Sequence, residues 1–236
     1  MSIPALSFRL AAFAVLYAFF DLAPSFLGHD LGHRLTSGDV LNFFMPLAVL
    51  PWLWLVHARL SPGVPELRRR IATTVLFVAT VMIADGHGMN LAANAVARQL
   101  QGHEGTGAWI LDYFFDEDMG HLLAQGGLVL ATYAWLLIAD GAADRQADWR
   151  TLAAASLLGF AYFADGVEGQ TVFLLLPGAL LGALWAAVGA RRAGARPLRH
   201  GVRGFLLVAY LTALVLFAIW GIWHRGFPEF SALGWI

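Results

Sequence analysis

Long apolar runs separated by short polar segments dominate the chain, and they predict seven helices that cross a membrane. A helix needs about 20 residues, at roughly 1.5 Å each, to cross the hydrocarbon core of a bilayer. The segments that reach or approach this length are residues 5–27, 41–56, 71–97, 109–138, 152–163, 172–188 and 205–223. The fifth is the shortest, and it reaches a spanning length only if Trp149 and Tyr162 act as anchors at the membrane interface.

Continuous apolar runs favour helices over a closed barrel, because a helix satisfies its backbone hydrogen bonds within one segment. We therefore expect an all-α fold, a polytopic membrane bundle of about seven transmembrane helices that residues 1–236 form as a single domain. The first apolar segment is expected to be a membrane anchor, not a cleaved signal peptide, because Asp21 follows it and no A-x-A cleavage site does.

The composition supports a membrane protein and excludes several classes of function. The chain is 59% hydrophobic and 13% charged, whereas a soluble domain has roughly 25% charged residues. A net charge of -1 gives no reason to expect a nucleic-acid partner, so membrane lipids and an apolar or lipid-derived small molecule are the expected partners. Without cysteine there are no thiolate metal ligands, and without lysine there is no Schiff base, which excludes a retinal photoreceptor.

Arginine is distributed unevenly between the two sets of connections. Of the fifteen basic residues, all arginine, twelve lie near the N-terminus or after the second, fourth and sixth apolar segments. Only Arg34, Arg98 and Arg225 lie on the other side. Short loops rich in arginine stay in the cytoplasm, which predicts a cytoplasmic N-terminus and, with seven crossings, a C-terminus outside. We expect a multi-pass protein of the bacterial inner (plasma) membrane.

Histidines and carboxylates gather at the arginine-poor ends of the apolar segments. These residues are His29, Asp30, His33, Asp85, His87, Asp112, Asp116, Glu117, Asp118, His121, Asp165, Glu168 and His224. A charged side chain inside a membrane costs about 2.5 kcal/mol or more, and such residues mark functional sites by default. The alternative to a functional site is a water-filled vestibule in which these charged side chains face water.

The spacing of these residues groups them further. His29 and His33 are four residues apart, as are Glu117 and His121, so on a helix each pair would direct two side chains toward one point. His87 continues a polar stripe at heptad spacing from Thr80 to Asn94, and such a stripe must face the interior of the bundle. Whether the acidic segment from Asp112 to Asp118 is helical stays open.

This many imidazole and carboxylate side chains at one end of the spans predict a site for a divalent metal ion. We expect the bound metal to be zinc or iron, and manganese or copper are the other options. The predicted metal ligands are His29, His33, His87, Glu117 and His121. The predicted catalytic or supporting carboxylates are Glu117, Asp85, Asp116 and Glu168.

The favoured function is therefore a metal-dependent membrane enzyme, hydrolytic or oxidative, that acts at the outer side on a lipid-like substrate. One alternative is a cation or proton transporter, or a channel component, with an acidic outer vestibule. Another is a haem-binding electron-transfer subunit with His87 and His121 as axial ligands. The aromatic segment from Trp220 to Trp235 is expected to anchor at the membrane interface, with a lid over the site as its alternative. The oligomeric state stays open.

Overall fold

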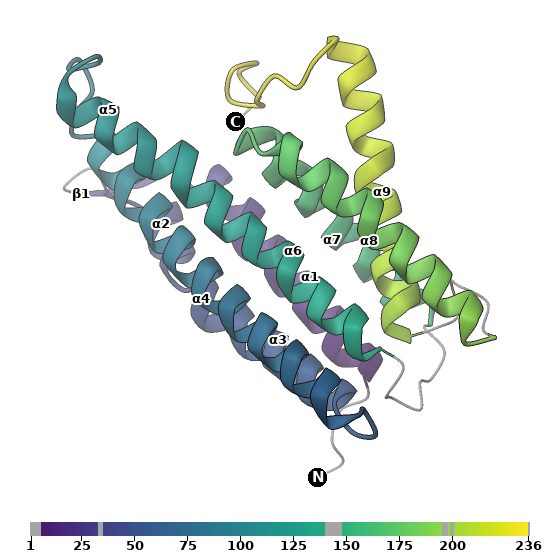
Figure 1. Ribbon diagram of the computed structural model, residues 1–236. Helices are drawn as coiled ribbons and strands as arrows, with labels where there is room; N and C mark the ends of the chain where they lie inside the picture. Colours follow the sequence, from purple (N-terminus) through teal and green to yellow (C-terminus); the bar gives the residue numbers. More distant parts are fainter. Residues whose placement is uncertain (1–5, 33–34, 140–147, 195–197, 199–200, 236) are drawn as a thin grey trace.

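The chain folds as a bundle of helices that run along one common direction (Figure 1). The structure, a computed structural model, describes residues 6–32, 35–139, 148–194, 198 and 201–235. Seven longer helices form the bundle: α1 (Leu6–Leu22), α3 (Met45–Leu60), α4 (Glu66–Ala97), α6 (His121–Ile138), α7 (Trp149–Glu168), α8 (Val172–Arg192) and α9 (Gly201–His224). The shorter elements are η1 (Ala23–Phe26), β1 (Asp30–Gly32), β2 (Leu35–Thr36), α2 (Ser37–Phe43), α5 (Gly107–Tyr113) and η2 (Phe114–Gly120), with β1 and β2 paired antiparallel.

Six stretches of helix in the described part of the chain are long and apolar enough to span a membrane. They are Leu6–Phe26, Ser37–Leu60, Glu66–Ala97, Gly107–Ile138, Val172–Arg192 and Gly201–His224. The expected polytopic helical bundle is confirmed, and the protein is a multi-pass integral membrane protein. The predicted fifth segment corresponds to α7, which is not among the six because even its most apolar stretch is less apolar on average than those of the six.

The helix α7 packs against protein on most of its surface and keeps one exposed stripe. It packs against α1 on one side and α9 on the other, with further contacts to α8. Eleven of its 20 residues are buried, among them Gly159, whose missing side chain leaves room for the backbone oxygen of Ala209. The exposed residues Ala153, Leu157 and Phe160 recur every three or four positions, so only a narrow face of α7 is left for lipid.

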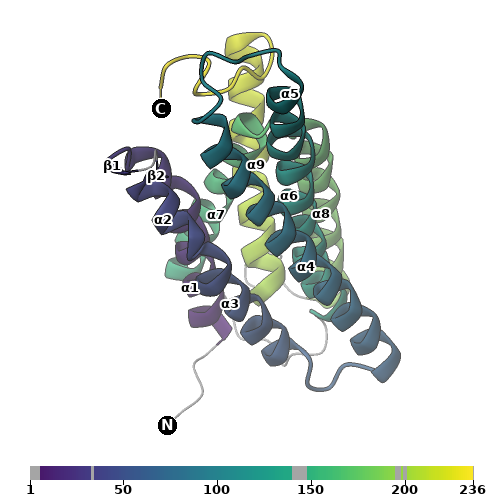
Figure 2. The same ribbon diagram turned by 90° about the vertical axis from the view of Figure 1, so that its left-hand side faces the viewer.

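The helices follow one another around the bundle in the order α1, α7, α9, α8, α6, α4 and α3. The N-terminus and the C-terminus lie at opposite ends (Figure 1, Figure 2), as seven passages of the chain require. We call the end that carries Arg59 and Arg191 the arginine-rich end, and the end that carries Asp21, Asp116 and Asp165 the acidic end. The assignment of the arginine-rich end to the cytoplasm stays a prediction.

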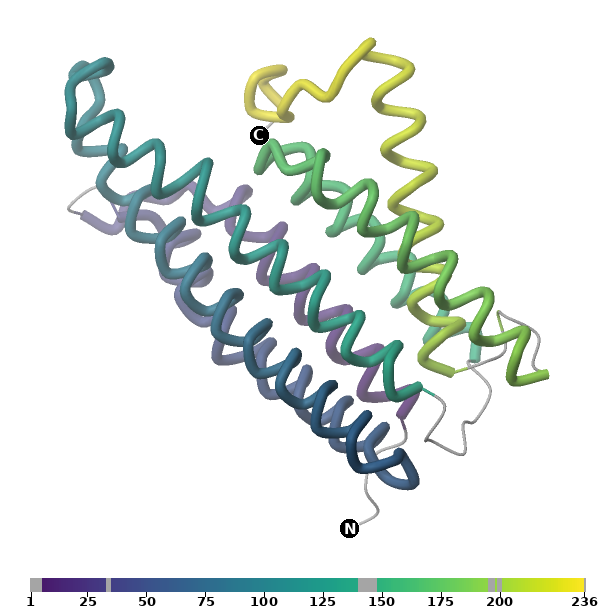
Figure 3. The backbone as a smooth tube through the Cα atoms, in the orientation of Figure 1, coloured from purple at the N-terminus to yellow at the C-terminus, as the bar shows by residue number. Residues whose placement is uncertain are grey.

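Glycines allow α4 and the helix beside it to touch along their length. Figure 3 shows α4 and α6 running side by side through the bundle. A Cβ atom added to Gly86 would lie 2.5 Å from the backbone oxygen of Gly120 and from the backbone nitrogen of Ala124. One added to Gly127 would lie 2.7 Å from the backbone oxygen of Ala79. Close backbone contact at small residues is a main source of helix association in membranes.

The helix α7 begins at an N-cap that supplies a pH-dependent part of its stability. Asp148 accepts hydrogen bonds from the hydroxyl group of Thr151 at 2.6 Å and from its backbone N–H at 2.8 Å. These hydrogen bonds from Thr151 hold the pKa of Asp148 below its ordinary value. This contribution is complete above the ordinary aspartate pKa of about 4, and it is lost as the pH falls through the lower folded value.

Replacing Asp148 by alanine is expected to destabilise the protein by about 1 kcal/mol at neutral pH, because the first turn of α7 loses its cap. Equilibrium unfolding in mixed micelles measures the loss. The Asp148→Ser variant is the control, because serine also caps helices and should retain most of the stability. An alanine variant as stable as the wild type would contradict the role of this cap.

Candidate functional site

A cavity of about 700 Å³ opens at the acidic end between two pairs of helices. One wall comes from α1 and α7, and the opposite wall comes from α4, η2 and the start of α6. The carboxyl groups that line it are Asp21, Asp39, Asp116, Glu117, Asp165, Glu168 and Glu229. The histidines that line it are His87 and His121. The predicted gathering of polar side chains at one end of the membrane spans is therefore confirmed.

The wall from α1 and α7 holds two carboxyl groups side by side. Asp21 and Asp165 lie within hydrogen-bonding reach of each other, and two carboxyl groups form such a bond only when one of them carries a proton. The hydroxyl group of Tyr17 donates to Asp165 Oδ2 at 2.5 Å. Tyr17 and Asp21 lie one turn apart on α1, so a single helix face presents both groups to α7. The result is a compact acid–base group in the cavity wall.

The opposite wall begins with a π-helix, the segment η2. The backbone N–H of His121 donates to the carbonyl group of Asp116, five residues earlier, as a π-helix requires. The segment from Asp112 to Asp118 is therefore helical, which answers the question left open by its sequence. Within η2, Asp116 is buried, and Glu117 lines the cavity beside it. Short π segments inside helices are frequent at functional sites.

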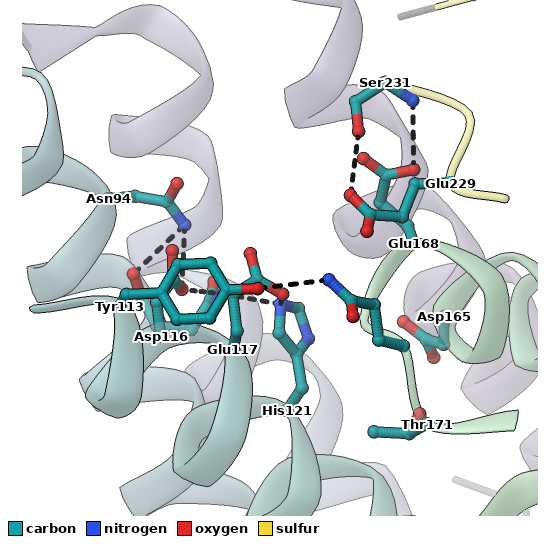
Figure 4. Close-up of polar contacts among 12 residues, drawn as sticks. Asn94, Tyr113, Asp116, Glu117, His121, Asp165, Glu168, Thr171, Glu229 and Ser231 are labelled. Carbon is teal, nitrogen blue, oxygen red and sulfur yellow. Dashed lines mark hydrogen bonds and ion pairs between the residues drawn. The ribbon is translucent and has the colours of Figure 1, made fainter. Parts of the chain in front are cut away.

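Asn90 of α4 connects the carboxylate of Asp116 with the imidazole of His121, the two side chains labelled on this wall in Figure 4. Its amide nitrogen lies 2.6 Å from Asp116 Oδ1 and 3.1 Å from His121 Nε2. Because an amide N–H donates, His121 Nε2 accepts, and the proton of a neutral His121 lies on Nδ1. Asn94 reaches the same carboxylate at 3.5 Å. The polar stripe of α4 therefore faces the interior, as its spacing predicts.

Glu117 has an unused acceptor inside the cavity wall. Its Oε2 atom lies 4.0 Å from His121 Nε2, so the two side chains do meet as their spacing predicts. The same oxygen is buried and has no hydrogen-bond partner among the residues that the structure describes. Buried carboxylate oxygens are normally satisfied, and one that is not indicates a missing partner at this position.

His121 and the bottom of the cavity are fixed by a tight turn between α7 and α8. A Cβ atom at Gly169 would lie 2.6 Å from His121 Nδ1, so only glycine lets the imidazole pack here. Gln125 donates to the carbonyl group of Asp165 at 2.9 Å and accepts from the hydroxyl group of Thr171. His87 of α4 lies on the same wall as His121, with its Nε2 atom 2.8 Å from the carbonyl oxygen of Asn42.

The segment after α9 folds over the mouth of the cavity. Glu168 accepts backbone hydrogen bonds from Phe230 at 2.8 Å and from Ser231 at 3.2 Å. The indole N–H of Trp220 donates to the carbonyl group of Pro228 at 3.1 Å. Because Glu229, Phe230, Ser231 and Trp235 line the cavity, this segment forms part of its wall and is not only an interfacial anchor.

Two predicted site residues, His29 and Asp85, do not line this cavity, and a third lies outside the described residues. His29 lies exposed in an extended segment, because the chain leaves the helix after η1 and turns at Gly32 with a φ of +97°. The prediction that it would share a helix face with His33 is wrong, and His33 lies outside the described residues. Asp85 is exposed on the surface of α4 and does not line the cavity, because its neighbour Gly86 faces α6.

The predicted metal ligands are therefore only partly brought together. His87, Glu117 and His121 line one cavity with Asp116 and Glu168, whereas His29 does not. Over the described ranges, no three histidine or carboxylate side chains are arranged to hold a metal ion. The roles of these residues as metal ligands or as catalytic base stay predictions.

Sequence reasoning missed the acid–base group on α1. Tyr17, Asp21 and Gln125 line the cavity, and none of them was predicted as a site residue. A signal was present, because Tyr17 and Asp21 are four residues apart at the end of an apolar segment. Their partner Asp165 is more than 140 residues away along the chain, so no local pattern connects them.

Comparisons with known proteins give no relative. The chain matches no protein-family model, no curated protein and no solved structure.

Proposed function

We propose that the protein is a membrane-embedded hydrolase that acts on a lipid-derived substrate in the cavity at its acidic end. The observation that carries this proposal is the hydrogen-bonded pair of Asp21 and Asp165. Two carboxyl groups that share one proton supply a general base and a general acid at the same place. The hydrogen bond from Tyr17 to Asp165 Oδ2 favours the ionised form of Asp165 and leaves the shared proton on Asp21.

This arrangement suits the hydrolysis of an ester or amide. The Asp165 carboxylate takes a proton from water as the water oxygen attacks the carbonyl carbon of the substrate. Asp21 gives its proton to the leaving oxygen or nitrogen as the bond to the carbonyl carbon breaks. The proton now on Asp165 passes back to Asp21, which restores the pair. The products are a carboxylic acid and an alcohol or amine, so all atoms and protons are accounted for.

The position and lining of the cavity favour an amphipathic substrate. Phe26 and Phe160 line the cavity, yet they are 73% and 42% exposed on the outside of the bundle. Apolar side chains that face both the cavity and the membrane region give an acyl chain a continuous apolar surface. A lipid-derived substrate can therefore place its polar part near Asp21 while its chain remains among apolar groups.

Turnover of a lipid extract by purified protein tests this function. Wild-type protein and an Asp21→Asn variant are incubated with mixed phospholipids and sphingolipids, and products are identified by mass spectrometry. We expect a fatty acid, alcohol or amine product with the wild type that is absent with Asp21→Asn. Equal product formation by the two proteins, or none by either across the lipid classes, would contradict the proposal.

A metal-assisted form of the same hydrolysis is a second candidate. It is favoured by the unpartnered Oε2 atom of Glu117, which lies 4.0 Å from His121 Nε2. A divalent ion between these two groups would satisfy the free oxygen and would activate a water molecule. His87 and Glu168 line the same cavity and would complete its ligands after side-chain rotation.

Elemental analysis of purified protein tests the metal. If the metal-assisted form holds, the wild type carries about one equivalent of zinc, iron, manganese or copper, and the Glu117→Gln and His121→Ala variants lose it. Wild-type protein with no more metal than these folded variants would exclude it. An absorption spectrum of the same sample tests the haem alternative, which requires a Soret band that disappears in the His121→Ala variant.

The transporter alternative needs a polar path through the rest of the membrane. Toward the arginine-rich end from the cavity, Phe13 and Trp135 pack edge to face with their ring centroids 5.1 Å apart, and both are fully buried. Leu128 of α6 is also buried, at 1% exposure. This packed apolar layer favours a closed reaction site over a conducting path.

A further inference from the structure

The mouth of the cavity carries more carboxylates than positive charges. Glu117, Glu168 and Glu229 come from three separate elements and lie within electrostatic range of one another (Figure 4). Arg98 is the one arginine among the described residues that line the cavity, and it forms an ion pair with Asp39 on the far side. Like charges crowded at a membrane-level cavity are unfavourable unless a cation lies among them.

Aromatic rings form the wall beside these carboxylates. Trp220, Phe230 and Trp235 line the cavity together with Phe163. The ring centroid of Trp220 lies 4.8 Å from that of Phe230 and 5.1 Å from that of Trp235. Because Glu168 binds the backbone of Phe230 and Ser231, the aromatic wall and the carboxylates are held as one unit.

Carboxylates and aromatic rings together select one kind of cation. A hydrated metal ion needs oxygen or nitrogen ligands on several sides, and aromatic rings supply none. An alkylated ammonium group is attracted to the faces of tryptophan and phenylalanine within about 6 Å, and carboxylates balance its charge. Phosphate or sulfate head groups would meet like charge at the same position.

We infer that the mouth of the cavity binds the ammonium head group of a cationic amphiphile, whose apolar chain leaves past Phe26 and Phe160. Glu229 and Glu168 balance the charge, and the wall of Trp220, Phe230 and Trp235 contacts the alkyl groups on nitrogen from one side. This site deepens the proposed function, because it assigns the head group of the substrate that the hydrolase would act on.

Binding of matched amphiphiles tests the site separately from hydrolysis. The protein is purified in maltoside micelles as the Asp165→Asn variant, so that no turnover is needed. Decyltrimethylammonium and decyl sulfate, each below its micelle concentration, are titrated by isothermal calorimetry. We expect the ammonium compound to bind at least about tenfold more tightly than the sulfate. Tetramethylammonium without a chain is the third ligand, and its competition with decyltrimethylammonium shows whether the head group alone is recognised.

Two substitutions locate the binding. Glu229→Gln removes one charge with little change of shape, and we expect it to weaken decyltrimethylammonium about tenfold. Trp220→Leu removes an aromatic face and should weaken it by a similar factor. The matched control is Glu104→Gln, because Glu104 is an exposed loop carboxylate that does not line the cavity. Thermal unfolding in the same micelles confirms that each variant is folded.

The outcomes separate this site from the proposed function. Selective ammonium binding that Glu229→Gln weakens supports the site, even if no lipid is hydrolysed. Equal or tighter binding of decyl sulfate, or folded Glu229→Gln protein that binds as tightly as Glu104→Gln protein, overturns it. Lipid hydrolysis that requires Asp21 would still stand in that case, with a substrate of different head group.

Discussion

Replacing Gly86 by valine is expected to disrupt the packing of α4 against the η2–α6 helix and to destabilise the protein by about 3 kcal/mol or more. The first added carbon would lie 2.5 Å from two backbone atoms, at Gly120 and Ala124, and backbone atoms cannot rotate away as side chains do. The helices must separate, which also moves Asp116 and His121 away from Asn90. Reversible unfolding in mixed micelles measures the loss.

Gly88→Val is the matched control for this change. Gly88 lies on the same helix two residues later, and a Cβ atom there would meet nothing within 4 Å. Both substitutions change helix propensity by the same amount, from glycine to valine, and add the same side chain, so the difference between them isolates the helix contact. If the two variants unfolded at the same denaturant concentration, the glycine contact would not be the source of stability.

The Asp165→Asn variant is expected to lose hydrolytic activity by about 10² to 10⁴-fold while it keeps its fold, because it loses the catalytic base. Asparagine keeps the shape of the side chain and can still accept the hydrogen bond from Tyr17. It cannot take a proton from water, so the loss should appear in kcat and not only in KM. The measurement is the rate of product formation on the lipid that the wild type hydrolyses.

Asp85→Asn is the control that distinguishes this role from a general effect of charge. Asp85 is a membrane-level carboxylate on α4 that is exposed outside the cavity. Its substitution is expected to leave the rate within about twofold of the wild type, since surface changes away from the site have small effects. A rate for Asp165→Asn within this range of the wild type would rule out the shared-proton pair as the catalytic group.

The membrane spans could be predicted from the sequence because lipid imposes a long apolar surface on each helix that faces it. The same reasoning explains the weakest prediction, the fifth segment. Much of α7 packs against α1, α8 and α9, which leaves only a narrow face for lipid, and its ends carry Arg150, Asp165 and Glu168. Apolarity reflects exposure to lipid, and it marks the ends of a largely buried helix poorly.

The sequence could predict those parts of the candidate site in which both residues lie on one helix, because their spacing then fixes their relative position. Glu117 meets His121, and Asn90 and Asn94 face the cavity, because neighbours on a helix face are fixed by its periodicity. The pairing of Asp21 with Asp165 could not be predicted in this way, because it depends on which helices become neighbours. The prediction for His29 was wrong for a different reason, since the i, i+4 rule applies only to a helix and the first helical stretch of the chain ends at Phe26.

The π-helix has a consequence for changes of length in this part of the chain. Its seven residues carry one more residue per turn than an α-helix would. A one-residue deletion between Phe114 and Gly120 would let ordinary α-helical hydrogen bonds run from α5 into α6. Six α-helical residues turn about as far around the axis as seven π-helical residues, so the helices on either side would keep nearly the same orientation. The side chains from Asp116 to His121 would shift within the cavity wall, so a deletion here would act on the site while it left the bundle in place.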